Sequence, residues 1–308
     1  MLHVLAVLAA AVLFGTTGTS QALGPQATTP LAVGAMRLAV GGVALAAVAA
    51  LLARRRARAR SAPAPRWTAR AGGLMVATAV ALVVYQPLFF LGTARNGVAV
   101  GTVIALGSAP VLAGIAEGLL TRRRPSRAWV SATALATIGV ALLGVGGSAG
   151  AVGGTDAIGL LGSVGAGASF AVIAVAQRRL LDAGWDPFTV VGAMGAGSAV
   201  LSLAVLPFLD LSWLADPRGI AMTLWLGLVT IAAAYALFTW GLGGLTAATA
   251  ATLTLAEPLT AGILGLTVLG EQLSPAAVVG LTVLAGGLVL LAWGSRRPRD
   301  PAPFAVEG

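Results

Sequence analysis

The sequence predicts an all-α integral membrane protein with about ten transmembrane helices, arranged as two inverted repeats of five helices. Three observations lead to this prediction: the composition, a series of long apolar segments, and an internal repeat of about half the chain length. Apolar residues make up 58% of the 308 residues, charged residues only 9%, and the mean hydropathy is +0.94. A soluble domain of this length needs far more charge to cover its surface, so the main solvent of this chain is the lipid bilayer.

Ten apolar segments are long enough to cross the hydrocarbon core, which requires about 20 residues of helix. The first segment lacks the basic leader of a signal peptide, and a second apolar segment follows almost at once, so we expect it to be retained as a helix. The ten expected helices span 4–23, 31–53, 71–94, 97–120, 128–146, 158–175, 188–207, 220–240, 245–269 and 275–293.

The distribution of arginine predicts the orientation of the chain. With the N-terminus in the cytoplasm, sixteen of the 19 basic residues fall in cytoplasmic segments, Arg95 and Arg218 fall outside, and Arg37 lies within the second helix. Because cytoplasmic loops carry the excess of basic residues, we expect a multi-pass protein of the bacterial inner membrane with both ends in the cytoplasm. The net charge of +9 comes from these clusters and does not indicate a nucleic-acid partner. The run 54–60 could also bind anionic lipid, although topology alone explains it.

The two halves of the chain repeat each other. A shift of 148 residues aligns Phe90 with Phe238 and Pro110 with Pro258. Proline and phenylalanine matches at one offset are harder to dismiss than matches between alanines or glycines. The two halves therefore predict a duplicated architecture.

Each repeat holds five helices, an odd number, so the second repeat must enter the membrane from the opposite side. We expect a first repeat over 1–146, a second over 147–294, and a disordered cytoplasmic tail over 295–308. The two repeats are then related by a pseudo-two-fold axis in the membrane plane. This symmetry suits alternating access, because exchanging the conformations of the halves turns an inward-open state into an outward-open state.

Several classes of chemistry are excluded by residues that the chain lacks. It has no cysteine and no lysine, and its one histidine is His3, so we expect no thiolate or multi-histidine metal site, no cofactor and no P-loop. The acidic residues are scattered mostly among the loops, so an enzyme active site is not expected either. A non-transporting structural subunit of a membrane complex and a passive channel remain the alternatives to a transporter.

Short motifs recur in a particular order along the chain. They are TPL at 29–31, MRL at 36–38, AP at 109–110, LAEPL at 255–259, LGEQLSP at 269–275, and Gly280. In order and spacing they resemble the drug/metabolite transporter superfamily, and within it the ten-helix members with two EamA-type repeats. The resemblance covers the chain from about residue 4 to residue 293.

The resemblance implies secondary transport of a small molecule, usually export of amino acids, other metabolites or toxic compounds such as drugs, with the lipid bilayer as the surrounding partner. It also implies a cavity between the repeats, lined mainly by the first, third, fourth, sixth, eighth and ninth helices. Protons are a candidate coupling ion, and the protein is expected to be a monomer or a homodimer. The two repeats differ where Ala109 matches Glu257 and where Gly195 matches Arg37.

Glu257 is the acidic residue that the sequence places near the middle of a membrane helix, about a dozen residues from either end of 245–269. An ionised carboxylate costs about 3 kcal/mol there even on the lenient insertion scale, so we expect it to be neutral, paired or hydrated. Two interpretations stay open. One is proton coupling or contact with a cationic group of the substrate, and the other is a structural pair or hydrogen bond between helices.

Arg37 lies a little inside the outer leaflet on the second expected helix. Its guanidinium can bind a substrate carboxylate with two hydrogen bonds. The family pattern at this position favours a structural role instead, in which the side chain reaches the interface or caps backbone carbonyls. We therefore expect a structural or coupling role for Arg37.

Side chains that combine an aromatic ring with a polar end are candidates for the wall of a substrate cavity. Tyr85, Gln86 and Pro87 interrupt the third helix, and Tyr235 and Trp240 lie on its repeat partner, the eighth. Such side chains can orient an organic substrate. Trp240 lies near a helix end, where an interfacial aromatic belt is the alternative explanation.

Two further amides and two prolines complete the candidate substrate-binding residues. Gln21 and Gln177 match each other between the repeats, although amides also tie helices together. Pro110 and Pro258 each free a carbonyl one turn earlier, which could face the cavity. Equally, these prolines could serve only to shape two bent helices.

The remaining acidic candidates are given structural roles. Glu271 precedes Ser274 and a proline, which are typical of the N-cap and first turn of the tenth helix. Glu117 lies three residues from the end of the fourth helix, and a surface ion pair with the arginines that follow it is expected.

Overall fold

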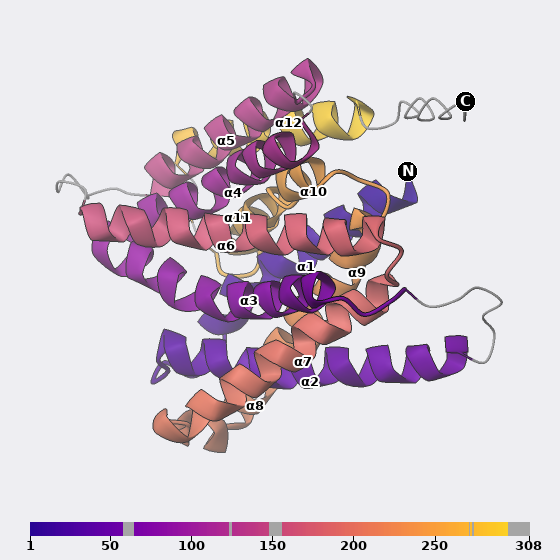
Figure 1. Cartoon of the computed structure of the whole chain (residues 1–308). Coiled ribbons are helices and arrows are strands. Elements are labelled where there is room, and N and C mark those ends of the chain that lie inside the picture. The colour runs from indigo at the N-terminus through magenta and orange to yellow at the C-terminus, as the bar shows by residue number, and fades with distance from the viewer. Residues whose placement is uncertain (58–64, 123–124, 148–155, 271, 273, 295–308) are drawn as a thin grey trace.

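The computed structural model shows a bundle of helices (Figure 1). It describes residues 1–57, 65–122, 125–147, 156–270, 272 and 274–294. No strand occurs among these residues, and ten helical spans are long and apolar enough to cross a membrane. The predicted number of transmembrane helices and the all-α class are therefore confirmed. Glu271 and the tail 295–308 lie outside the described residues.

The first five spans are single helices. They are α1 (Leu2–Ala22), α2 (Pro30–Ala57), α3 (Ala69–Asn96), α4 (Val98–Thr121) and α5 (Arg127–Gly147). Serine and threonine side chains begin two of them: Ser126 Oγ accepts from the amide of Trp129, and Thr68 Oγ1 accepts from the amide of Ala71, both at 3.1 Å. Such caps satisfy amides that have no partner within the helix.

In the second half, the eighth span contains a π-helical segment and the ninth span is broken. The elements are α6 (Ala157–Asp182), α7 (Pro187–Val205), the short helices η1 (Leu206–Phe208) and η2 (Ser212–Ala215), α8 (Pro217–Leu224), a π-helix η3 (Trp225–Ala233), α9 (Ala234–Leu242), α10 (Ala247–Leu253), α11 (Ala256–Thr267) and α12 (Pro275–Gly294). The predicted cap of the last helix is confirmed, because Ser274 Oγ accepts from the amide of Ala277 at 3.2 Å.

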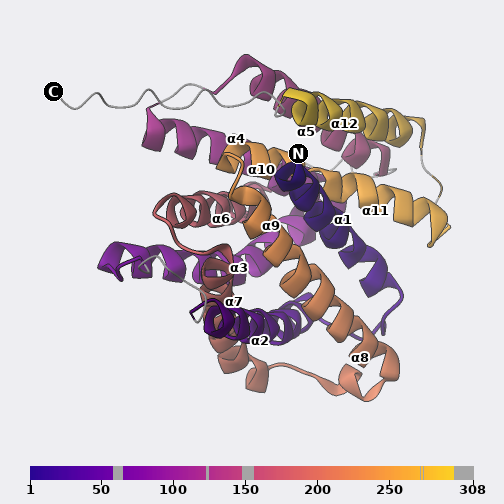
Figure 2. The ribbon, with the colours of Figure 1, turned by 90° about the vertical axis from the view of Figure 1, so that its right-hand side faces the viewer.

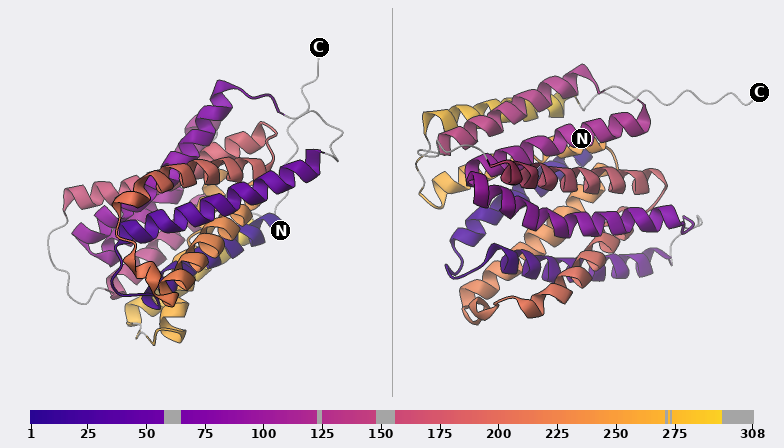
Figure 3. Two further views of the ribbon diagram at one scale, coloured as in Figure 1. Left: turned by 90° about the horizontal axis from the view of Figure 1, so that it is seen from below. Right: turned by 60° about the vertical axis from the view of Figure 1, so that its left-hand side comes forward.

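The contacts between helices come in symmetric pairs, as inverted repeats require. α2 packs on α7 and α5 packs on α12, and each of these pairs joins two equivalent helices (Figures 1 and 2). The packing of α3 and α4 on α6 has its counterpart in the packing of η3, α9 and α11 on α1. α5 and α12 form one edge of the bundle and α2 and α7 the opposite edge (Figure 1), as the right-hand view of Figure 3 also shows.

Glycines allow the closest of these approaches. A Cβ atom at Gly139 of α5 would lie 2.5 Å from the backbone nitrogen of Leu284 on α12, and one at Gly280 would lie 2.8 Å from the carbonyl oxygen of Gly139. Any larger side chain would push the two helices apart. Small residues thus set the spacing of this pair, as is common between helices in membranes.

The ninth span breaks at Thr254 and Leu255, directly before Glu257 and Pro258. Pro258 has no amide hydrogen to donate to the carbonyl of Thr254, one turn earlier. That carbonyl instead accepts from the amide of Glu257 at 2.9 Å, and Leu255 bonds in the same tight pattern to Thr252 at 3.1 Å. The sequence predicts one apolar segment here, and the structure resolves it into two helices, α10 and α11.

Candidate functional site

Four ionisable side chains from both repeats come together between the halves of the bundle. They are Arg37 of α2, Tyr85 of α3, Tyr235 of α9 and Glu257 of α11, and we call them the central cluster. The Arg37 guanidinium lies within electrostatic range of the other three groups, and Tyr85 lies within range of Glu257 and Tyr235. Two opposite charges and two phenols therefore share one site inside the membrane-spanning part of the protein.

Arg37 has an unused donor inside the bundle. Its side chain is half-buried, and its Nε is buried with no hydrogen-bond partner within the described part of the chain. Buried polar groups are nearly always hydrogen-bonded in proteins, so an unpaired guanidinium nitrogen is available to a ligand. The structural or coupling role of Arg37 stays a prediction.

Glu257 lies in the first turn of α11, immediately after the helix break. α1 approaches this turn closely: a Cβ atom at Gly15 would lie 2.6 Å from the carbonyl oxygen of Glu257 and 2.6 Å from Cβ of Thr260. The break, Pro258 and Gly15 together fix where the Glu257 backbone runs. Discontinuous helices of this kind recur at the binding sites of transporters.

Aromatic rings surround the two tyrosines. Tyr235 packs edge-on against Phe14 of α1, with ring centroids 5.0 Å apart, and lies 6.3 Å from Phe238. Tyr85 stacks on Phe89 at 5.9 Å. The phenol of Tyr235 is thus held by packing between α1 and α9, which restricts its rotation.

Gln86 supports the cluster from α3. Its side chain is only 6% exposed and lies against Gly34, where a Cβ atom would be 3.5 Å from Cγ of Gln86. Gly34 is three residues before Arg37, so Gln86 packs on α2 about one turn from the arginine.

The other predicted substrate-binding residues lie elsewhere. Gln177 is fully buried; it accepts a hydrogen bond from Thr239 Oγ1 at 2.8 Å and donates to Met194 Sδ at 3.2 Å, so it ties α6, α7 and α9 together. Trp240 stacks on His3 at 4.8 Å near the end of α9. Gln21 is half-buried in the last turn of α1, at the other end of the bundle.

Both predicted prolines lie within helices. Pro110 is buried inside α4, which continues unbroken through it, and Pro258 is half-buried in α11. The equivalent prolines therefore have different effects on the two repeats, since only the second repeat is interrupted beside its proline.

The connection between α9 and α10 is held by a contact that sequence reasoning missed. Arg178 of α6 donates from Nη1 to the carbonyl oxygens of Leu242, Gly243 and Leu245 at 2.8, 2.9 and 2.9 Å. Its other side forms an ion pair with Asp182. The sequence assigns Arg178 only to topology, and no local signal points to carbonyls more than 60 residues away.

Glu117 reaches the same connection from α4. Its Oε2 accepts from the amide of Ala248 in the first turn of α10 at 2.8 Å. We call Arg178, Glu117 and their bonds to 242–248 the latch. The sequence predicts a surface ion pair between Glu117 and the arginines that follow it, Arg122 and Arg123. Arg123 lies outside the described residues, and the contact that the structure shows is the one with α10.

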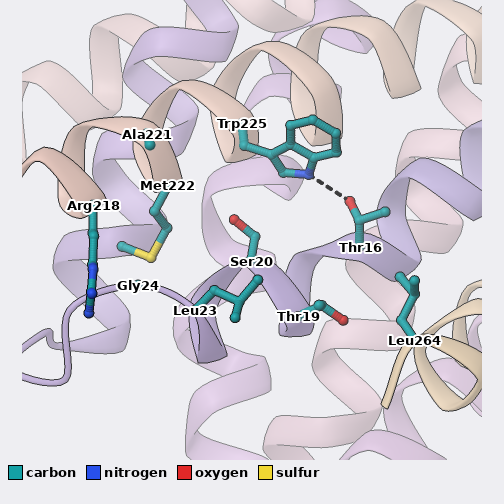
Figure 4. Close-up of a pocket in the computed structure, with 10 residues that line it drawn as sticks. All are labelled: Thr16, Thr19, Ser20, Leu23, Gly24, Arg218, Ala221, Met222, Trp225 and Leu264. Carbon is teal, nitrogen blue, oxygen red and sulfur yellow. Dashed lines mark hydrogen bonds between the residues drawn. The ribbon is translucent and has the colours of Figure 1, made fainter. Parts of the chain in front are cut away.

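The opposite end of the bundle holds a pocket of about 430 Å³ (Figure 4). It lies between the end of α1, the helix α8 with the start of η3, and α11. The α9–α10 connection, which the latch holds, lies at the end of the bundle that carries the N-terminus, and α8, which lines the pocket, lies at the opposite end (Figure 1). The lining residues are Thr16, Thr19, Ser20, Leu23, Gly24, Arg218, Ala221, Met222, Trp225 and Leu264.

Ten apolar crossings in two inverted repeats, with a charged cluster between the repeats, define the class of multi-pass membrane transporters. The model of the EamA-like transporter family matches residues 1–145 and 157–293, and the chain belongs to this family.

Two known proteins are similar over nearly the whole chain. The Uncharacterized transporter YwfM of Bacillus subtilis (strain 168) is 40% identical over 298 residues, which are 97% of this chain and 96% of that protein. A solved crystal structure with 20% sequence identity superposes with a TM-score of 0.76 and covers 96% of this chain and 97% of its own. The latter likeness concerns the fold alone.

Proposed function

We propose that this transporter moves small zwitterionic metabolites, amino acids or compounds related to them, by alternating access through the central cluster. The observation that carries the proposal is that Arg37 of the first repeat lies within electrostatic range of Glu257 of the second, while Arg37 Nε has no hydrogen-bond partner among the described residues. The direction that we propose is export, which the family resemblance implies.

The central cluster is complementary to a zwitterion. The guanidinium of Arg37 can take a carboxylate with two hydrogen bonds, and the carboxylate of Glu257 can take an ammonium group. Tyr85 and Tyr235 add phenol hydroxyls and ring faces beside the two charges. A substrate with both charges neutralises both groups at once, whereas a substrate with one charge leaves the other group unpaired at a cost.

The two ends of the bundle support alternating access. The latch holds the α9–α10 connection at the end that carries Met1, and the pocket lies at the other end. Exchange of conformations between inverted repeats would reverse this difference. We place the latch end in the cytoplasm of a bacterial inner membrane, because the described arginines Arg66, Arg70, Arg122, Arg127, Arg178 and Arg179 belong to segments at that end.

Counterflow in proteoliposomes tests the proposal. Vesicles loaded with unlabelled L-leucine should take up labelled L-leucine faster than labelled leucinamide, which lacks the carboxylate, or N-acetylleucine, which lacks the ammonium group; a panel of other amino acids extends the comparison. Arg37→Gln and Glu257→Gln should each lower the exchange about tenfold or more, the effect of losing one charge-assisted hydrogen bond. Arg95→Gln, at an exposed position, is the control.

Two results would overturn this function. Equal exchange of all three leucine derivatives would show that the two charges of the central cluster do not select the substrate. Downhill flux without counterflow would indicate a channel, because only a carrier exchanges one substrate molecule for another.

A further inference from the structure

The pocket at the end opposite the latch has a wall of hydroxyl groups from α1. Thr16, Thr19 and Ser20 share one face of the helix, as residues three and four apart do. Thr16 is already engaged, since its Oγ1 accepts from Trp225 Nε1 at 2.9 Å (Figure 4). The same hydroxyl donates to the carbonyl of Leu13 at 2.7 Å. The hydroxyls of Thr19 and Ser20 have no hydrogen-bond partner among the described residues, so they remain available to a ligand.

The remaining lining is apolar apart from one cation. Leu23, Ala221, Met222 and Leu264 contribute carbon and sulfur surface, and Arg218 lies at the rim beside Met222 (Figure 4). No acidic side chain of the described residues lines the pocket. The nearby Asp216 is directed elsewhere, since its Oδ1 accepts from the backbone amide of Arg218 at 2.8 Å and caps α8.

The pocket shares its walls with the central cluster. Thr16 directly follows Gly15, which packs on the backbone of Glu257, and Leu264 lies about two turns beyond Glu257 on α11. A ligand in the pocket therefore lies on the same pair of helices that hold the carboxylate of the central cluster.

We propose that this pocket is a second binding site, for a small carboxylate that carries an apolar body. The carboxylate meets Arg218 at the rim, the apolar body lies against Met222, Trp225 and Leu264, and Thr19 and Ser20 donate to polar atoms of the ligand. The inference rests on the proposed function, because the carboxylate expected here is that of the transported zwitterion. It adds that the transported zwitterions have apolar side chains. The same chemistry is offered by the anionic headgroup of a lipid, so the test separates the two sources.

Binding is measured directly, without transport, on the full chain in nanodiscs of neutral phosphatidylcholine. Labelled 4-methylpentanoate is the anionic probe, and 4-methylpentylamine is its cationic counterpart of the same shape. We expect the anion to bind more tightly than the amine. Arg218→Gln should weaken the binding of the anion about three- to tenfold, as the loss of one partly exposed ionic contact does.

Filling the pocket gives a second, independent variant. Ala221 is exposed and lines the pocket, so Ala221→Phe should abolish binding without disturbing the core. Leu224→Phe on the same helix and Arg95→Gln at the same end of the bundle are the matched controls and should bind as the unchanged protein does. Addition of phosphatidylglycerol distinguishes the sources: competition with the probe would support the site and assign it to lipid, and absence of competition would support a soluble carboxylate.

Equal affinity for anion and amine, or binding that survives both Arg218→Gln and Ala221→Phe, would overturn the proposal. The proposed function fails separately. If the probe binds as expected but no amino acid exchanges in counterflow, the pocket stands and the transport of zwitterions does not.

Discussion

Glu117 Oε2 accepts a hydrogen bond from the amide of Ala248 at 2.8 Å, so a carboxylate of the first repeat caps a helix of the second. Arg178 holds the preceding connection through three carbonyl oxygens. The latch thus joins α4 and α6 to the connection between α9 and α10 at one end of the bundle, and its bonds must break if that end is to open. This requirement gives the first prediction.

Loss of Arg178 should expose the interior of the latch end. Because the chain has no cysteine, a single Ala250→Cys, at a fully buried position of α10, reports accessibility without further changes. Labelling of this cysteine by a membrane-impermeant maleimide from the latch side should be several-fold faster when Arg178→Gln is added. Arg179→Gln is the control, since the Arg179 side chain makes only a 3.5 Å contact with the carbonyl of Leu120. The same rate in all three proteins would mean that the latch does not govern opening.

Glu257 should determine any dependence of transport on pH. The charged and titratable groups that face it are Arg37, Tyr85 and Tyr235, and Glu257 is the only carboxylic acid of this cluster. Exchange by the unchanged protein, measured from about pH 5.5 to about pH 8.5, should change with pH, because protonation of the Glu257 carboxylate removes the charge that would meet an ammonium group. Exchange by Glu257→Gln should be slower and independent of pH. Unchanged transport by the variant across this range would rule out coupling through Glu257.

Enlarging Gly15 should destabilise the protein, because α1 lies against the turn that carries Glu257. A Cβ atom there would be 2.6 Å from both the Glu257 carbonyl oxygen and Cβ of Thr260. Gly15→Val should lower the free energy of unfolding by about 2 kcal/mol or more, as overpacking does. At Gly18 no atom lies within 4 Å of an added Cβ, so Gly18→Val, measured by thermal unfolding in the same detergent, is the control. Equal melting temperatures would contradict the close packing of α1 on α11.

Asp156 should contribute a small, pH-dependent stabilisation at the start of α6. The backbone N–H of Gly159 donates to its carboxylate at 2.7 Å and, together with the charge of Arg95, lowers the pKa of Asp156 below its usual value. A lowered pKa means that the stabilisation is present above the usual pKa of an aspartate and is lost as the pH falls through the lower, folded-state value. The difference in melting temperature between the unchanged protein and Asp156→Ala should therefore shrink below about pH 4. A difference that is independent of pH would contradict the role of the charge.

Features of this fold that depend on residues close in the sequence can be predicted from the sequence, and features that depend on distant segments cannot. The helices and the caps at Ser126 and Ser274 depend on apolar length and on neighbours three residues away, so the sequence is sufficient to place them. The break at Thr254 depends on which carbonyl loses its partner beside Pro258, and the equivalent Pro110 leaves α4 continuous. Local sequence does not distinguish these two outcomes.

The candidate site shows the same division. Sequence reasoning singles out Arg37, Tyr85 and Glu257 because polar groups are rare in apolar helices. Their arrangement as one cluster depends on how α2, α3 and α11 pack, which no spacing along the chain reveals. Sequence reasoning missed the pocket around Arg218 for a further reason. An arginine near a helix end is counted as a topology signal, and only the folded structure shows that the end of α1 lies beside it.

The pairs α2–α7 and α5–α12 each join equivalent helices of the two repeats, and this has a mechanical consequence. A two-fold rotation leaves every point on its axis where it was. If the halves exchange conformations as we propose, these two seams are mapped onto themselves, whereas the contact of α3 with α6 is mapped onto the contact of α9 with α1. We therefore expect the pairs α2–α7 and α5–α12 to keep their contacts during such an exchange, and the glycines of the α5–α12 seam hold these two helices close together.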